Sequence, residues 1–258
     1  MAKSFKAEKV LTTLSPKSEL QGLHFTTSHT GKMAGLHSIS TSVVLNKSCA
    51  RRRLVEGSIC SKCFAAAMMD RYTDLDKCVQ QNTEILTASV LPLSVLPLFP
   101  SRYFRFEAFA ELVNATQVIN YFNMARKNPD TLCALWTKNP HIIQKAIEAG
   151  HEKPANLQIV LSSPLINKPI KSTKYTFVDK IFTVYDKKTA KDVNINCGAR
   201  SCLACGRCYR PNPEGAKIQY INEVLKYALQ DLRPLIWSIT GIVTRSGSKF
   251  NQFNLLLL

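Results

Sequence analysis

The sequence predicts an α/β protein with a mainly parallel sheet. Short segments rich in β-branched and aromatic residues alternate with segments of helical character, and this alternation is typical of β/α units with right-handed crossovers. The chain has 258 residues, of which 45% are hydrophobic, so it can bury a full core. We expect a single α/β domain over residues 1–230 and a tail over residues 231–258 to which we assign no structure.

Five segments are predicted to be strands. The first, SISTSVVL, is rich in β-branched residues, and the second, YFRFEAF, alternates aromatic with charged or small residues. The third, TLCALW, is a short apolar run bounded by turn signals, as in a buried strand. The predicted strands cover residues 38–45, 103–109, 131–136, 157–161 and 181–185.

Helices are predicted between these strands. Residues 64–91 lack Gly and Pro for most of their length and contain many helix formers, so we expect one long helix there. Asn114 can cap a second helix, whose apolar residues recur at helical spacing and which should end at Asn128. Pro140 and Gly150 flank a third helix over residues 141–149.

The cysteine count and the N-terminal sequence bear on the compartment. The first 20 residues lack the apolar run of a secretory signal, and the apolar stretch 85–99 is too short to cross a bilayer and contains Pro92 and Pro97. We therefore expect a cytoplasmic protein without membrane contact. In a reducing compartment the nine cysteines would be free thiols that serve a metal or catalysis rather than disulfides.

The chain is strongly basic, with a formal charge of +16 and an isoelectric point near 9.6. Basic residues cluster at Arg51, Arg52 and Arg53 and along residues 168–191. Two interpretations stay open. One is that nucleic acid or another phosphate-bearing ligand binds this basic surface, and the other is that the charges form a solvated face that keeps the protein soluble.

Four cysteines lie within twelve residues in the sequence NCGARSCLACGRCY. The run of cysteines separated by two residues is typical of a loop that wraps an iron–sulfur cubane, and we expect a [4Fe-4S] cluster. A structural zinc site is the alternative, although zinc sites usually use two separated pairs of ligands. The predicted ligands are Cys197, Cys202, Cys205 and Cys208.

A second cysteine group follows the first predicted strand and comprises Cys49, Cys60 and Cys63. Three thiolates would leave one iron of a cubane open to a small ligand, unless a cysteine of the other group completes the site. One or two clusters are therefore both compatible with the sequence. Cys78 and Cys133 stand alone in a predicted helix and a predicted strand, and we expect them in the core.

Other polar residues follow the predicted strands at their carboxyl ends, where ligands collect in parallel α/β sheets. We take four of them as candidate cofactor-binding residues, with ordinary surface polarity as the alternative for each. Arg105, within the second predicted strand, is interpreted as an outward-facing residue. The four candidates are Glu107, Glu111, Lys138 and Ser162.

Five segments, in the order given, resemble the phage gene product 88 family: GKMAGLHSISTSVVLNKSC, GSICSKCFAA, FRFEAFAEL, LWTKNP and NINCGARSCLACGRCY. The resemblance spans roughly residues 30–226. It implies a bacteriophage or prophage origin and work inside a bacterial host cell, and it brings no known reaction. Its recurring cysteines map to Cys49, Cys60, Cys63, Cys197, Cys202, Cys205 and Cys208.

The order of the elements is also similar to that of radical S-adenosylmethionine enzymes, whose three-cysteine loop follows the first strand of a partial, or half, barrel. This similarity implies a cluster with one open iron that binds the methionine end of S-adenosylmethionine. The usual spacing of three and two residues is replaced here by a wider gap between Cys49 and Cys60.

Two hypotheses for function result. The first is a phage-derived iron–sulfur protein with an activity like that of the radical S-adenosylmethionine enzymes. The second is a zinc-stabilised, non-catalytic phage protein that binds nucleic acid or a host protein.

Overall fold

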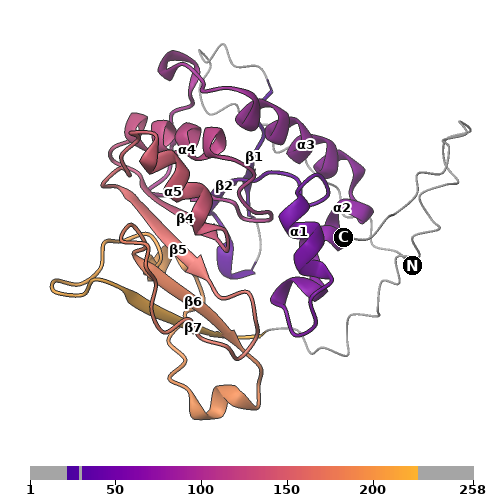
Figure 1. Ribbon diagram of the computed structural model, residues 1–258, viewed down its shortest axis with the longest axis vertical. Helices are drawn as coiled ribbons and strands as arrows, with labels where there is room; N and C mark the ends of the chain where they lie inside the picture. The colour runs from indigo at the N-terminus through magenta and orange to yellow at the C-terminus, as the bar shows by residue number, and fades with distance from the viewer. Residues whose placement is uncertain (1–21, 29–30, 226–258) are drawn as a thin grey trace, which may run out of the picture. The chain divides into compact units, whose positions relative to one another are not determined.

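The computed structural model describes residues 22–28 and 31–225, which belong to one compact unit; the predicted tail 231–258 lies outside them. Seven strands form one sheet in chain order, with β1 antiparallel to β2 and every later pair parallel (Figure 1). The predicted α/β class with a mainly parallel sheet is confirmed, and the sheet is open, as in a partial barrel. The strands are β1 (Phe25–Thr27), β2 (His37–Ile39), β3 (Tyr103–Phe106), β4 (Leu132–Thr137), β5 (Leu157–Ser162), β6 (Lys180–Tyr185) and β7 (Gln219–Val224).

Helices cover one face of the sheet. Figure 1 shows α3, α4 and α5 side by side on this face. Alternate strand residues such as Phe104, Leu135 and Ile159 face the helices and pack against buried residues such as Phe122 and Ile143. The helices are α1 (Lys47–Arg53), α2 (Phe64–Arg71), α3 (Thr73–Ala88), α4 (Ala115–Lys127), α5 (Pro140–Glu148) and α6 (Cys202–Cys205).

The opposite face of the sheet, here called the inner face, is covered by the chain between β6 and β7. Tyr209 packs there against Tyr103 and Trp136, with ring centroids 5.0 and 5.9 Å away. Gly206 ends α6 with a φ of 59°, and a Cβ at this position would lie 2.4 Å from Tyr103 Oη. Only glycine therefore allows the segment to lie this close to the sheet.

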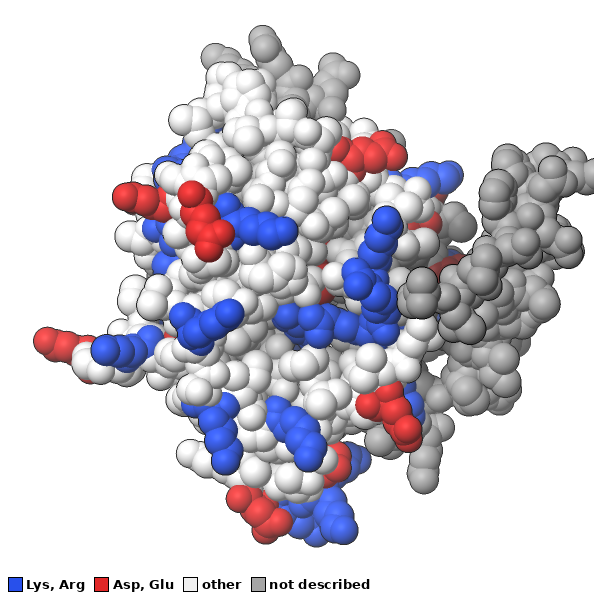
Figure 2. All heavy atoms as spheres, in the orientation of Figure 1, with Lys and Arg blue, Asp and Glu red and all other residues white. Residues whose placement is uncertain are grey.

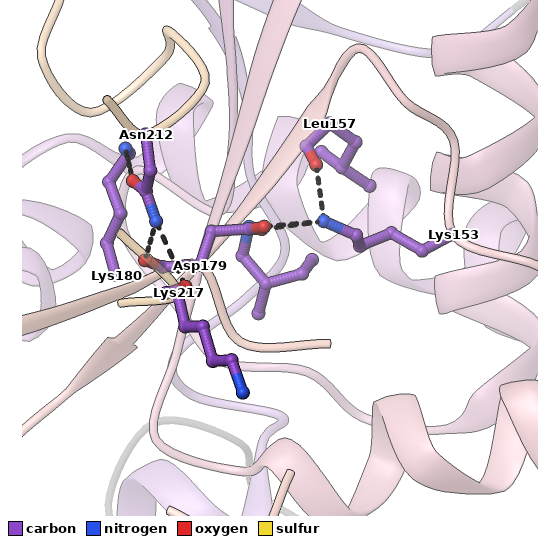
Figure 3. Close-up of polar contacts among 7 residues, drawn as sticks. Lys153, Leu157, Asp179, Lys180, Asn212 and Lys217 are labelled. Carbon is purple, nitrogen blue, oxygen red and sulfur yellow. Dashed lines mark hydrogen bonds and ion pairs between the residues drawn. The ribbon is translucent and has the colours of Figure 1, made fainter. Parts of the chain in front are cut away.

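Hydrogen bonds at the amino edge of the sheet fasten the end of this segment (Figure 3). The Asp179 carboxylate accepts from Lys153 Nζ at 2.8 Å and from the Ile159 N–H at 2.7 Å, which joins β5 to the start of β6. Asn212 donates to the Asp179 carbonyl at 2.8 Å and accepts from Lys180 Nζ at 2.6 Å. The inner-face segment is thus anchored to the strands that it covers.

The structure corrects some predicted boundaries. The first predicted strand, 38–45, is paired only as β2. The chain turns beyond it, where the Ser42 side chain accepts from the Val44 N–H, while Ser40 accepts from the Ala108 N–H of the loop after β3. The predicted helix 64–91 is interrupted at Tyr72, where α2 ends and α3 begins. Strands β1 and β7 were not predicted.

The other predicted elements are confirmed with small changes of boundary. The strands predicted at 131–136, 157–161 and 181–185 are β4, β5 and β6, and the strand predicted at 103–109 is the shorter β3. Asn114 caps α4 by accepting from the Gln117 N–H, and α4 ends before Asn128. The predicted helix 141–149 is α5.

Candidate metal centres

Three thiols, called here the proximal thiols, follow β2. Cys49 lies on α1, Cys60 lies in a short 3-10 helix over Ile59–Lys62, and Cys63 precedes the first residue of α2. Parallel strands bring the loops at their carboxyl ends to one edge, so the proximal thiols share that edge with the loops after β3, β4 and β5. All nine cysteines are free thiols.

Asn46 fixes the position of Cys49. Its side-chain oxygen accepts from the Ser48 and Cys49 N–H groups, at 2.9 and 3.1 Å, and so caps α1. Its amide nitrogen donates to the Glu111 carbonyl at 2.6 Å. The same side chain therefore begins the helix and joins it to the loop after β3.

The loop that carries Cys60 is paired with the loop after β5. The Ile59 N–H donates to the Pro164 carbonyl at 3.0 Å, and the Ile166 N–H donates to the Gly57 carbonyl at 3.1 Å. Ser58 caps the 3-10 helix by accepting from the Cys60 N–H at 3.0 Å. This pairing of loops, called here the loop clasp, joins the chain between α1 and α2 to the loop after β5.

The surroundings of Cys49 are apolar and negatively charged. It packs with Val43 and Met69 in a small buried cluster. Burial, followed by the charges of Glu111 and the other proximal thiols, raises the pKa of Cys49 to about 12. Without a metal this thiol is protonated at neutral pH, and coordination would have to displace its proton.

Glu107 is fully enclosed at the end of β3. Its carboxyl group accepts hydrogen bonds from Thr41, from Tyr121 Oη at 2.6 Å and from Gln117 Nε2 at 2.5 Å. Burial raises the pKa of Glu107 to about 7, although the bonds from Tyr121 and Thr41 oppose the shift. Its φ of 55° is unusual for a residue other than glycine, and the surrounding donors hold this strained backbone.

Glu111 and Lys138 meet at the ends of β3 and β4. The Lys138 N–H donates to the Glu111 carboxylate. Burial raises the pKa of Glu111, and the positive charges of Lys138 and Arg52 oppose this shift. Arg52 also donates to the Lys138 carbonyl at 2.9 Å and to Asn139 Oδ1 at 2.7 Å. Two of the predicted candidates, Glu111 and Lys138, are therefore hydrogen-bonded to each other, and Arg52 of α1 binds the main chain at Lys138.

Ser162, the fourth predicted cofactor-binding residue, is the last residue of β5 and is buried. Because Leu161 faces the helices, the alternation of the strand places Ser162 on the inner face. It therefore lies at the carboxyl edge, but on a different strand from the glutamates.

The four remaining predicted ligands, called the distal thiols, are Cys197, Cys202, Cys205 and Cys208. They follow β6 as predicted, but the chain then turns back over the inner face. Burial raises the pKa of Cys208 to about 12, and the charges of Cys197, Cys202 and Cys205 all affect it. The four thiols are therefore close enough to influence one another electrostatically.

Cations lie near the distal thiols. Lys32 Nζ is 3.0 Å from Cys197 Sγ, and the charge of Arg105 opposes the rise in the pKa of Cys202 and Cys208. Arg105 was interpreted as outward-facing, but its guanidinium lies 4.0 Å from the ring centroid of Trp136 on the inner face. The sequence carries no signal for these contacts, since they join residues far apart in the chain.

Two features relate to metals and single cysteines. Within residues 22–28 and 31–225, no group of three or more Cys, His, Asp or Glu side chains is arranged to hold a metal ion. The donor set itself, soft thiols without disulfides, fits iron–sulfur clusters and zinc.

Cys133 is buried in the core as predicted, whereas Cys78 is half-buried on α3.

Basic side chains are spread over the face seen in Figure 2, and several lie together near its middle. Residues 46–63, which hold the proximal thiols, contain five basic residues and one acidic residue. Among the described residues no helix is long and apolar enough to span a membrane.

Searches of known protein families, curated proteins and solved structures find no match to this chain.

Proposed function

We propose that the chain is a phage-derived iron–sulfur protein that works in the cytoplasm of a bacterial host, with [4Fe-4S] clusters on the proximal and the distal thiols. The observation that carries this proposal is the presence of two distinct groups of free thiols. Cys49 and Cys63 of the proximal group pack in the buried cluster of α1, α2 and α3, and Cys208 of the distal group packs on the inner face. Three and four thiolates match the ligand numbers of an open and a closed cubane.

The proximal centre is the proposed place of chemistry. When bound, a cluster with three thiolate ligands supplies an electron and an open iron for a chelating ligand such as S-adenosylmethionine. Glu107 and Glu111 are buried, and their charges act on Cys49, so the surroundings of the site are acidic. Such surroundings would attract the cationic sulfonium of this ligand, and Lys138 and Ser162 offer further polar contacts at the same edge.

Anaerobic purification with measurement of iron, acid-labile sulfide and zinc per chain tests this proposal. Iron and sulfide near cubane stoichiometry support it, and zinc alone contradicts it. S-adenosylmethionine is then added to the reduced protein, and the electron paramagnetic resonance spectrum is recorded. A spectrum that the ligand leaves unchanged would refute the S-adenosylmethionine part of the proposal while leaving the clusters in place.

A second candidate function is a zinc-stabilised protein that binds nucleic acid. The excess of basic residues in segment 46–63, where Lys47 and Arg51 are exposed, favours it. A phosphate backbone on this surface would release counterions, so the affinity for DNA or RNA should fall steeply as salt is added. Fluorescence anisotropy between low and moderate salt measures this slope. Absence of binding at low salt excludes this function, and a host protein would then be the partner to seek.

A further inference from the structure

Lys32 places its ammonium group directly against a distal thiol. It lies in the 3-10 helix Gly31–Met33 between β1 and β2, and Nζ is 3.0 Å from each of three acceptors: Cys197 Sγ, the Cys197 carbonyl and Glu223 Oε1. An ammonium group has three N–H donors, and here each has an acceptor. The side chain is only 15% exposed, so these contacts are shielded from water.

This arrangement places a hydrogen-bond donor on the Cys197 sulfur, although burial itself raises the pKa of that thiol. A neutral thiol is a weak acceptor, whereas a thiolate beside a buried cation forms a charge-assisted hydrogen bond. The ammonium nitrogen of Lys32 is held 3.0 Å from the Cys197 sulfur, where it can donate to a metal-bound thiolate.

Packing of the backbone holds Lys32 in place. Gly35, with a φ of 78°, closes the turn after the 3-10 helix, and a Cβ there would lie 2.8 Å from Leu203 Cδ1 of α6. The chain that carries Lys32 is thus in close contact with the helix that carries Cys202 and Cys205. The position of Lys32 relative to the distal thiols is fixed by this contact rather than by a flexible loop.

We propose that Lys32 is the positioning residue of the distal centre: its ammonium group hydrogen-bonds the metal-bound thiolate of Cys197, strengthens metal retention and makes the cluster easier to reduce. The inference rests on the proposed iron–sulfur function for its redox part. Hydrogen bonds and positive charge near cluster sulfurs stabilise the reduced, more negative state, so they raise the reduction potential. The positive charge of Arg105 acts on Cys202 and Cys208, and the negative charge of Glu223, the ion-pair partner of Lys32, acts on Cys197 and Cys202.

The test uses the full chain with Cys60→Ala, so that the distal thiols are the complete group. Lys32→Met, Lys32→Arg and Lys77→Met are compared in this background. Lys77 has a side chain that is 77% exposed on α3, and its substitution makes the same change of charge without touching a thiol. Iron retention against a chelator and the midpoint potential are measured on anaerobically reconstituted protein.

Lys32→Met is expected to weaken metal retention roughly ten- to a hundredfold, as loss of outer-shell partners commonly does, and to shift the potential to more negative values. Lys32→Arg should recover part of both, and Lys77→Met should match its parent. If iron and sulfide are present but Lys32→Met leaves metal retention and the reduction potential unchanged, the inference is overturned. If Lys32→Met does not fold, Lys32→Gln replaces it, with the same expected direction and the same contradicting result.

Failure of the proposed function has a different signature, namely no iron or sulfide in any variant. The role of Lys32 is then tested by titrating the metal-free protein with Co²⁺. The thiolate-to-metal charge-transfer absorption measures how much Co²⁺ is bound. Weaker Co²⁺ binding by Lys32→Met than by Lys77→Met upholds its role at the distal thiols. Equal binding, or none to the parent, overturns it.

Discussion

At the proximal thiols, the carboxyl groups of Glu107 and Glu111 add to burial in raising the pKa of Cys49. At the distal thiols, Lys32 and Arg105 oppose the effect of burial. The two groups offer the same ligand atoms, but carboxyl groups act on Cys49, whereas Cys197 accepts from Lys32, which is itself paired with Glu223. The hydrogen bond from Lys32 should make a distal cluster easier to reduce, so we expect the proximal cluster to be the stronger reductant.

The largest expected effect is the loss of one cluster when a cysteine of the proximal or the distal group is substituted. Cys60→Ala should remove the proximal cluster and leave the distal one, and Cys205→Ala should do the reverse, because Cys49 and Cys63 pack in one buried cluster and Cys208 packs in another. Iron and sulfide analysis checks this. Loss of all iron in either variant would show instead one composite site that draws on both groups.

The substitution Glu107→Gln tests the acidic surroundings of the proximal thiols through the pH dependence of stability. The pKa of Glu107 is raised from 4.5 to about 7, so the folded state binds more protons than the unfolded state between these values. Its contribution to stability is fully present below about pH 4.5 and is lost as the pH rises through 7, by about 3 kcal/mol at most. In urea denaturation of the metal-free protein, the free energy of unfolding of Glu107→Gln should depend less steeply on pH over this range than that of the wild type. A slope equal to that of the wild type would contradict the assignment.

Asn46→Ala should cost about 1–2 kcal/mol, since it removes the cap of α1 and the bond to the Glu111 carbonyl. The free energy of unfolding measures the cost. A chelator should then take iron from the proximal group sooner than from the distal group. Asn114→Ala, which removes the cap of α4, is the matched control. Equal loss of iron in both variants would argue against a specific role of Asn46.

The smallest expected effect comes from the amino edge. Lys153→Met breaks the ion pair with Asp179, which is partly shielded, and should cost about 1 kcal/mol or less. Asn212 also binds Asp179, so any change in metal retention should appear at the distal group. A change confined to the proximal group would contradict this connection.

The sequence allowed prediction of the central strands because β4, β5 and β6 are buried and rich in apolar residues. The end of β2 was missed because the β-branched run continues past Ile39, while the Ser42 side chain accepts from the Val44 N–H and turns the chain. The start of α3 had a usable signal, since Asp74 and Asp76 in its first turn are typical of a helix N-terminus.

The parts of the candidate sites that could be predicted are those with a signal in a short stretch of sequence. The cysteine spacing predicted both thiol groups, and the position after a predicted strand indicated Glu107 and Glu111. The contact of Lys32 with Cys197 could not be predicted, because the two residues are 165 positions apart in the sequence and only the fold brings them together. The return of the distal segment over the inner face also depends on long-range packing, such as that of Tyr209 on Tyr103.

The loop clasp gives the order of events during synthesis. Ser58 and Pro164 are 106 residues apart, so the loop of Cys60 cannot take its final position until β5 has left the ribosome. At roughly 5–20 residues per second, the proximal thiols would wait about 5–20 s after Cys60 is made. During this interval they are exposed to oxidants and to stray metal ions. Loading of the proximal centre is therefore expected to follow translation.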